Sequence, residues 1–144
     1  MKKEEVAISS FNSGYNCTQA VLTTFSEQYG LDQATALRIS CCFGGGMGMM
    51  AGVCGAVSGA YMVLGLRYCS SGNDIQSSKE DAYSMIRQFT DRFKERHGSI
   101  ICKEILGCDI STEDGMHKAM DEGLFESVCS DFVRDSAKII EALI

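Results

Sequence analysis

The sequence predicts an all-α protein, a single-domain helical bundle of about five to seven helices with a buried glycine-rich central helix. Apolar residues recur at helical spacing along most of the chain, and alternating strand patterns rich in β-branched residues are missing. The 144 residues include no proline, so nothing forbids long helices. This length is typical of one domain, here residues 1–144, and allows a hydrophobic core without disulfide bonds.

The predicted helices combine an apolar stripe with a terminating residue. Residues 13–29 place Cys17, Val21 and Phe25 on one face, and Gly30 follows as a C-terminal stop. The later helices are predicted over residues 33–43, 51–69, 78–97, 100–106, 112–122 and 124–144.

The longest uncharged stretch, residues 39–66, predicts the central helix. A membrane span needs about 20 apolar residues, so the length alone would permit one. Eight glycines dilute its hydrophobicity, however, and those at 44–48 would break a spanning helix in its middle. We therefore expect a glycine turn at 44–48, a buried helix over 51–69 and no membrane span.

Small residues repeat along this helix. Ala51, Gly55 and Gly59 recur every four residues and so would share one face. Glycine inside a helix costs about 1 kcal/mol relative to alanine, a cost that close approach of another group can offset. That group could be a tightly packed helix, or a cofactor or sulfur site beside Gly55 and Gly59. Met47, Met49 and Met50 are predicted to fill gaps in the core.

Charge and cysteine content limit the classes of function that the chain could have. The chain has 13 Lys and Arg against 19 Asp and Glu, for a net charge of −6, which argues against sequence-independent binding to nucleic acid or anionic lipid. Its first residues lack the apolar segment of a secretory signal, so we expect a cytoplasmic protein, where disulfides are kept reduced. Eight cysteines in that setting indicate metal binding or redox chemistry.

The cysteines are dispersed, and none forms C-x-x-C, which excludes a thioredoxin-like dithiol, a zinc ribbon and a ferredoxin-type run. Cys17, Cys54, Cys102 and Cys129 lie on apolar helical faces or beside the glycines, where core packing is one interpretation. The first three also lie near predicted helix N-termini, which favour a reactive, metal-binding thiolate. The roles of the remaining four stay open: Cys41, Cys42, Cys69 and Cys108.

Two segments carry a resemblance to a known family. Asn16-Cys17-Thr18-Gln19-Ala20-Val21 and Cys54-Gly55-Ala56-Val57-Ser58-Gly59, followed by Cys102 and Cys129, resemble the C-GCAxxG-C-C family of putative redox-active proteins. The family label reads Gly-Cys-Ala where this chain reads Cys-Gly-Ala, with the Ala-x-x-Gly spacing retained. The resemblance implies that these four cysteines are the defining ones. More distantly, the chain is similar to the non-haem part of split-Soret cytochromes, which hold an iron–sulfur cluster, although it lacks their haem attachment sequence.

Three functions remain open. Four converging thiolates would suit an iron–sulfur cluster, in particular [2Fe–2S], for electron transfer, or a structural zinc ion. Alternatively, two of these cysteines could cycle between dithiol and disulfide without a cofactor, for instance Cys54 with Cys17 or Cys102. The third is a non-catalytic interaction protein. Whether the chain is an enzyme, and which redox partner it has, stays open; a homodimer would fit an exposed glycine or methionine surface.

Overall fold

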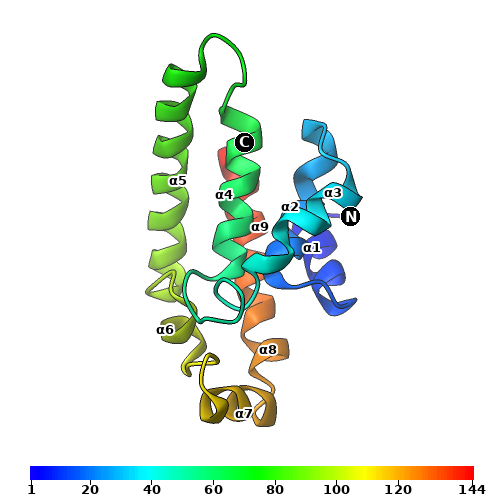
Figure 1. The fold of residues 1–144 in the computed structure, drawn as a ribbon, viewed down its shortest axis with the longest axis vertical. Coiled ribbons are helices and arrows are strands. Elements are labelled where there is room, and N and C mark those ends of the chain that lie inside the picture. The colour runs from blue at the N-terminus through cyan, green and yellow to red at the C-terminus, as the bar shows by residue number, and fades with distance from the viewer.

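The computed structural model describes residues 1–144 and is all-helical (Figure 1). Its only strand-like feature is an isolated antiparallel bridge between Val53 and Ile101. Two short 3-10 turns, η1 (Ser26–Tyr29) and η2 (Cys41–Phe43), follow the second and third helices. The α-helices are α1 (Lys3–Asn12), α2 (Cys17–Phe25), α3 (Gln33–Ser40), α4 (Gly55–Tyr68), α5 (Ile75–His97), α6 (Cys102–Leu106), α7 (Glu113–Asp121), α8 (Leu124–Ser127) and α9 (Cys129–Leu143).

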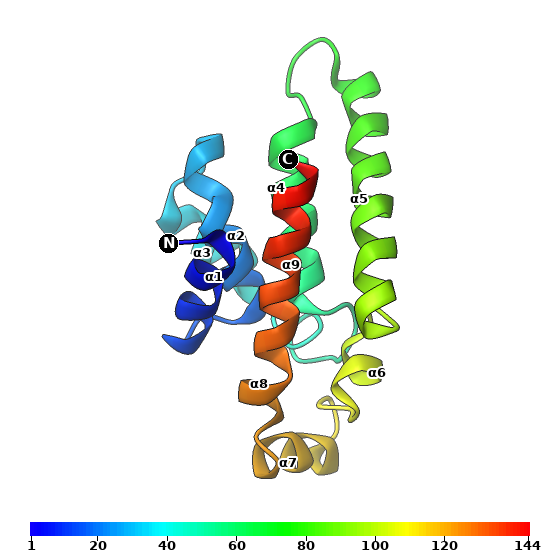
Figure 2. The same cartoon turned by 180° about the vertical axis from the view of Figure 1, so that it is seen from behind.

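The long helices α4, α5 and α9 run side by side (Figures 1 and 2). The α1–α3 segment packs against one side of this group, through contacts of α2 with α4 and of α1 with α9. The short helices α6, α7 and α8 gather at one end. The core between the helices contains the fully buried side chains of Phe25, Leu64, Phe89, Phe93 and Ile140.

The prediction was wrong at both ends of the chain: it lacked the first helix, and it joined the last two helices into one. Helix α1 was not predicted, because its sequence is polar and only Ala7 is buried; contacts with α2 and α9 stabilise it instead. The segment predicted as one helix, 124–144, is divided at Val128 into α8 and α9. These two differences raise the number of α-helical segments above the predicted range.

The predicted helix over 51–69 begins later than expected. Ala51 has a left-handed backbone with φ of +59°, and Cys54 is the extended residue that precedes Gly55. Ala51 therefore does not share a helical face with Gly55 and Gly59, contrary to the prediction. The reason is the loop before α4, which is held in a conformation that an α-helix does not contain.

Gly55 and Gly59 lie where α4 crosses α2. A Cβ atom at Gly55 would lie 2.7 Å from Thr18 Oγ1, and one at Gly59 would lie 3.0 Å from both Thr18 O and Val21 Cβ. Both distances are those of close helix packing, in which a missing side chain lets the neighbouring backbone approach. The contact brings the start of α2, which carries Cys17, next to the start of α4.

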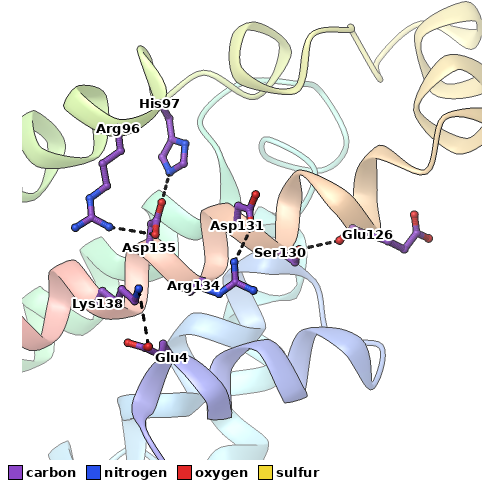
Figure 3. A network of polar contacts seen from close by, with 9 residues as sticks. All are labelled: Glu4, Arg96, His97, Glu126, Ser130, Asp131, Arg134, Asp135 and Lys138. Carbon is purple, nitrogen blue, oxygen red and sulfur yellow. Dashed lines mark hydrogen bonds and ion pairs between the residues drawn. The ribbon is translucent and has the colours of Figure 1, made fainter.

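Polar contacts hold α9 in place between α5 and α1 (Figure 3). Asp135 of α9 accepts a hydrogen bond from Arg96 Nη1 at 3.1 Å, and its other carboxylate oxygen lies 2.9 Å from His97 Nε2; both partners are at the end of α5. On another face, Lys138 Nζ lies 3.9 Å from Glu4 Oε1 of α1. Exposed pairs each contribute little energy, but together they orient the helix that begins at Cys129.

No helix combines the length and the apolar character that crossing a lipid bilayer would require. The uncharged stretch 39–66 is instead divided among the end of α3, the loop that follows and the first part of α4.

The glycine contact gives a stability prediction with an internal control. Gly59→Ala should lower the free energy of unfolding by about 1–3 kcal/mol, because the new methyl group would press on Thr18 and Val21. Gly65→Ala on the same helix should raise it by about 1 kcal/mol, because nothing lies within 4 Å of that Cβ position. Urea denaturation of both variants measures the difference, and equal effects would contradict the close contact.

Candidate functional site

The four family-type cysteines all lie where a helix begins. Cys17, Cys102 and Cys129 are the first residues of α2, α6 and α9, and Cys54 is the N-cap of α4. The sequence placed three of them near helix starts. It missed the fourth, since the division between α8 and α9 has no glycine at Val128 to mark it.

These helix starts meet at one cavity of about 460 Å³, and all four cysteines line it. Its inner wall consists of buried residues, among them Cys54, Cys102, Leu106 and Phe132. Gly55 also lines the cavity. Gly59, predicted as part of the same site, does not line it and lies against α2 instead.

Backbone hydrogen bonds place Cys54 beside Cys102. The amide of Cys102 donates to Gly52 O at 2.6 Å, and the amide of Cys54 donates to Ile100 O at 2.8 Å. The two segments thus pair on either side of the bridge between Val53 and Ile101. This pairing is an interaction between distant parts of the chain that local sequence patterns do not reveal.

Asn16 connects the start of α2, at Cys17, to the segment that leads to α4. Its side-chain oxygen accepts from Gln19 N at 2.9 Å and so caps α2, while its Nδ2 donates to Cys41 O at 2.9 Å. The N-cap therefore fixes the start of α2 relative to the loop that leads to Cys54. Gly44 makes room for this contact, because a Cβ there would lie 2.6 Å from the Asn16 side chain.

The loop between η2 and α4 is wound in the left-handed sense. Residues 45–49 all have positive φ, and they include Met47 at +70° and Met49 at +64°. Non-glycine residues in this region cost about 1–2 kcal/mol each, so surrounding contacts must hold them there. Hydrogen bonds from Gly48 N to Cys42 O and from Gly52 N to Gly46 O, at 2.7 and 2.8 Å, close the loop on itself.

This loop adds a thioether to the cavity wall. Met49 lines the cavity, although its side chain is 44% exposed and so lies toward the opening. The prediction that Met49 and Met50 fill the core was wrong, because the left-handed loop turns both outward. The sequence signal for the loop was the run of glycines, which predicted a turn but not its handedness.

Contact between two of the cysteines gives them different acidities. The neighbouring Cys129 sulfur, burial and the other cavity cysteines raise the pKa of Cys17 well above its usual value. The Cys17 thiol in turn lowers the pKa of Cys129, against burial and the charge of Glu126. Cys129 is therefore the first of the pair to lose its proton.

The other two thiols stay protonated at neutral pH. Burial raises the pKa of Cys54 to about 12 and that of Cys102 to about 11, with further increases from neighbouring cysteines. Of the four cavity cysteines, only Cys129 has a lowered pKa, so it is the first to form a thiolate. Thiolate is the form that attacks electrophiles and binds metals.

The arrangement of the four cysteines bears on which kind of metal group they could hold. No three His, Cys, Asp or Glu side chains are close enough together to hold one metal ion. The four cysteines surround a hollow instead of converging on a point.

The remaining cysteines lie outside the cavity. Cys41, Cys42 and Cys69 are exposed and Cys108 is half-buried, and all eight cysteines of the chain are free thiols. The four cysteines that line the cavity are thus the four that the resemblance to the C-GCAxxG-C-C family implied, although Cys108 lies close enough to Cys102 to raise its pKa.

A comparison with known families bears on this arrangement. The family model described as "Putative redox-active protein (C_GCAxxG_C_C)" matches residues 15–143. The chain belongs to this family. The match confirms the resemblance noted in the sequence and covers every residue of the cysteine cavity from Tyr15 onward. No curated protein and no solved structure matches the chain.

The sequence did not predict several of the residues that line the cavity. Phe11, Tyr15, Phe125 and Phe132 contribute aromatic rings to the wall, and Glu126 contributes a carboxylate. They come from α1, the loop after it, α8 and α9. No motif links them, so only their spatial proximity reveals a role.

The proximity of Cys17 to Cys129 predicts the pH dependence of alkylation in the metal-free protein. Cys129 should be the first of the four cavity cysteines to react with iodoacetamide as the pH rises, because its thiolate forms first. Cys17→Ala removes the thiol that lowers the pKa of Cys129, so that pKa should rise and alkylation of Cys129 at neutral pH should slow about tenfold. Mass spectrometry of the labelled peptides measures both rates.

Cys69→Ala is the matched control, since Cys69 is exposed and does not line the cavity. An unchanged pH profile for Cys129 in the Cys17→Ala variant would show that the two thiols do not interact.

Proposed function

We propose that this protein transfers electrons through an iron–sulfur cluster held by Cys17, Cys54, Cys102 and Cys129. One observation carries the proposal: four thiols from four different helix starts line the same cavity. A disulfide would need only two of them, whereas cysteine-ligated iron–sulfur clusters use four.

The donor set suits such a group. The four ligands are thiols, which are the characteristic ligands of iron–sulfur clusters. Because they surround a hollow and no three could share one ion, a multi-atom group fits better than a structural zinc ion, which needs a compact tetrahedron. A cluster bound there, of the [2Fe–2S] type for example, would accept and return single electrons.

The surrounding residues would adapt the cavity to this task. Cys54 and Cys102 must lose their protons on binding, so loading should be favoured at higher pH. The helix N-termini of α2, α4 and α9 direct partial positive charge toward the sulfurs and offset their negative charge. Leu106, Ile110 and Phe132 are buried in the inner wall, where they would keep water and oxidants away from the sulfurs.

A second function is favoured by the contact between Cys17 and Cys129. The two thiols lie close together and their pKa values shift in opposite directions, as those of an attacking thiolate and a resolving thiol do. The Cys129 thiolate would attack a partner disulfide and release one partner thiol. Cys17 would then attack the mixed disulfide, lose its proton and release the second partner thiol, which leaves a Cys17–Cys129 disulfide.

Metal content tests the first proposal. Protein purified anaerobically should be coloured and should contain iron and acid-labile sulfide. Serine at any one of Cys17, Cys54, Cys102 or Cys129 should lower both contents severalfold, because one ligand is lost. Cys41→Ser and Cys69→Ser are matched controls outside the cavity and should leave both contents unchanged. Colourless, iron-free protein after reconstitution with iron and sulfide would overturn the cluster.

Oxidation tests the second function. Iron-free protein treated with a mild disulfide oxidant should form one linked peptide pair, Cys17 with Cys129, which mass spectrometry identifies. Cys129→Ser should abolish this product, while Cys108→Ser should leave it intact. Random pairing among the eight cysteines would contradict a specific dithiol.

A further inference from the structure

The cysteine cavity is larger than its sulfur chemistry requires. At about 30 Å³ for each water-sized atom, a group of two irons and two sulfides would occupy about 120 Å³. This is roughly a quarter of the 460 Å³ available. Sites for small organic molecules span about 300–1,000 Å³, so the cavity falls within their range.

Aromatic rings surround this extra space. Phe11, Tyr15 and Phe125 are half-buried and Phe132 is buried, and they approach the cavity from α1, the following loop, α8 and α9. Aromatic side chains bind flat apolar molecules through stacked or edge-to-face contacts. The second apolar groove of the protein, about 440 Å³ between α2, α3 and α4, has no aromatic residue in its lining.

The charges of the cavity restrict its ligand further. No Lys, Arg or His lines it, and its one charged residue is Glu126. An anion placed there would find no cationic side chain, would compete with the cysteine sulfurs for the partial positive charge of the helix N-termini, and would be repelled by the carboxylate. The walls therefore disfavour phosphates, carboxylates and nucleotides.

The cavity has an opening through which a ligand can reach the cysteines. Asn12, Gly14, Met49 and Glu126 are exposed lining residues and form its rim, whereas the cysteine wall is mostly buried. The left-handed loop supplies one side of this rim through Met49. A molecule that enters past Met49 and Glu126 would end against the sulfurs.

We infer that the cysteine cavity binds a small, uncharged aromatic molecule beside the four cysteines. The binding follows from the volume, the rings and the charges of the cavity, and it does not depend on which redox function is correct. The further conclusion that this molecule exchanges electrons with the sulfurs rests on the proposed function.

Two fluorescent probes that differ only in charge test the binding. N-phenyl-1-naphthylamine is uncharged, and 8-anilinonaphthalene-1-sulfonate has the same rings with an added sulfonate. The protein as purified should bind the uncharged probe at least about tenfold more tightly, because the anion meets no cation in the cavity. Fluorescence titration gives both dissociation constants.

Variants at the rim of the cavity test which residues cause the preference for the uncharged probe. Glu126→Gln should strengthen binding of the anionic probe severalfold, and Met49→Arg should do so further, with little change for the uncharged probe. Met50→Arg is the matched control, because Met50 is the neighbouring residue, is 70% exposed and does not line the cavity. Both methionines are exposed, so neither change disturbs the core.

Two further variants distinguish the cavity from the second groove. Phe125→Asp should weaken binding of the uncharged probe at least about tenfold by placing a charge in the cavity wall. Ile39→Glu, in the second groove and 50% exposed, should have no effect. Equal affinity for the two probes, equal effects of the two arginines, or loss of binding only in Ile39→Glu would overturn the inference.

Failure of the ligand site and failure of the iron–sulfur cluster would give different results. Cys54→Ser should lose iron but keep the uncharged probe, since the aromatic walls remain. Wild-type protein that stays iron-free after reconstitution with iron and sulfide, yet still selects the uncharged probe, would contradict the cluster and support the ligand site.

Discussion

Four sulfur atoms share one largely buried cavity, and they cannot all be negatively charged there without compensation. Burial and mutual repulsion keep Cys54 and Cys102 protonated, while the neighbouring Cys17 thiol lowers the pKa of Cys129. Either protons or metal must therefore neutralise the site. The two redox functions proposed for this protein correspond to those two ways of satisfying the same electrostatic constraint.

The rest of the fold brings these sulfurs together and keeps them in place. Gly55 and Gly59 allow α2 to lie close to α4, and backbone pairing around Val53 and Ile101 joins the starts of α4 and α6. Asp135 ties α9 to the end of α5. Together these contacts position α2, α4, α6 and α9, the four helices that carry the cysteines. The site therefore depends on the packing of the whole chain and not on one local motif.

The surroundings of the sulfurs determine what can reach them. Aromatic rings and Glu126 favour an uncharged apolar molecule at the opening, and buried aliphatic side chains exclude water from the inner wall. The strained loop at 45–51 contributes to this opening through Met49. A molecule that reaches the sulfurs would thus be selected by shape and charge.

The sequence by itself determined the helical class and, through the resemblance to a family, singled out the four cysteines that line one cavity. The class follows from helical periodicity without proline, which is a local property of the chain. Only the tertiary structure decided that α9 begins at Cys129, that Cys17 lies beside it, and that Met47, Met49 and Ala51 adopt left-handed backbones. Local propensity opposes or ignores all three, because each is imposed by contacts between residues far apart in the chain.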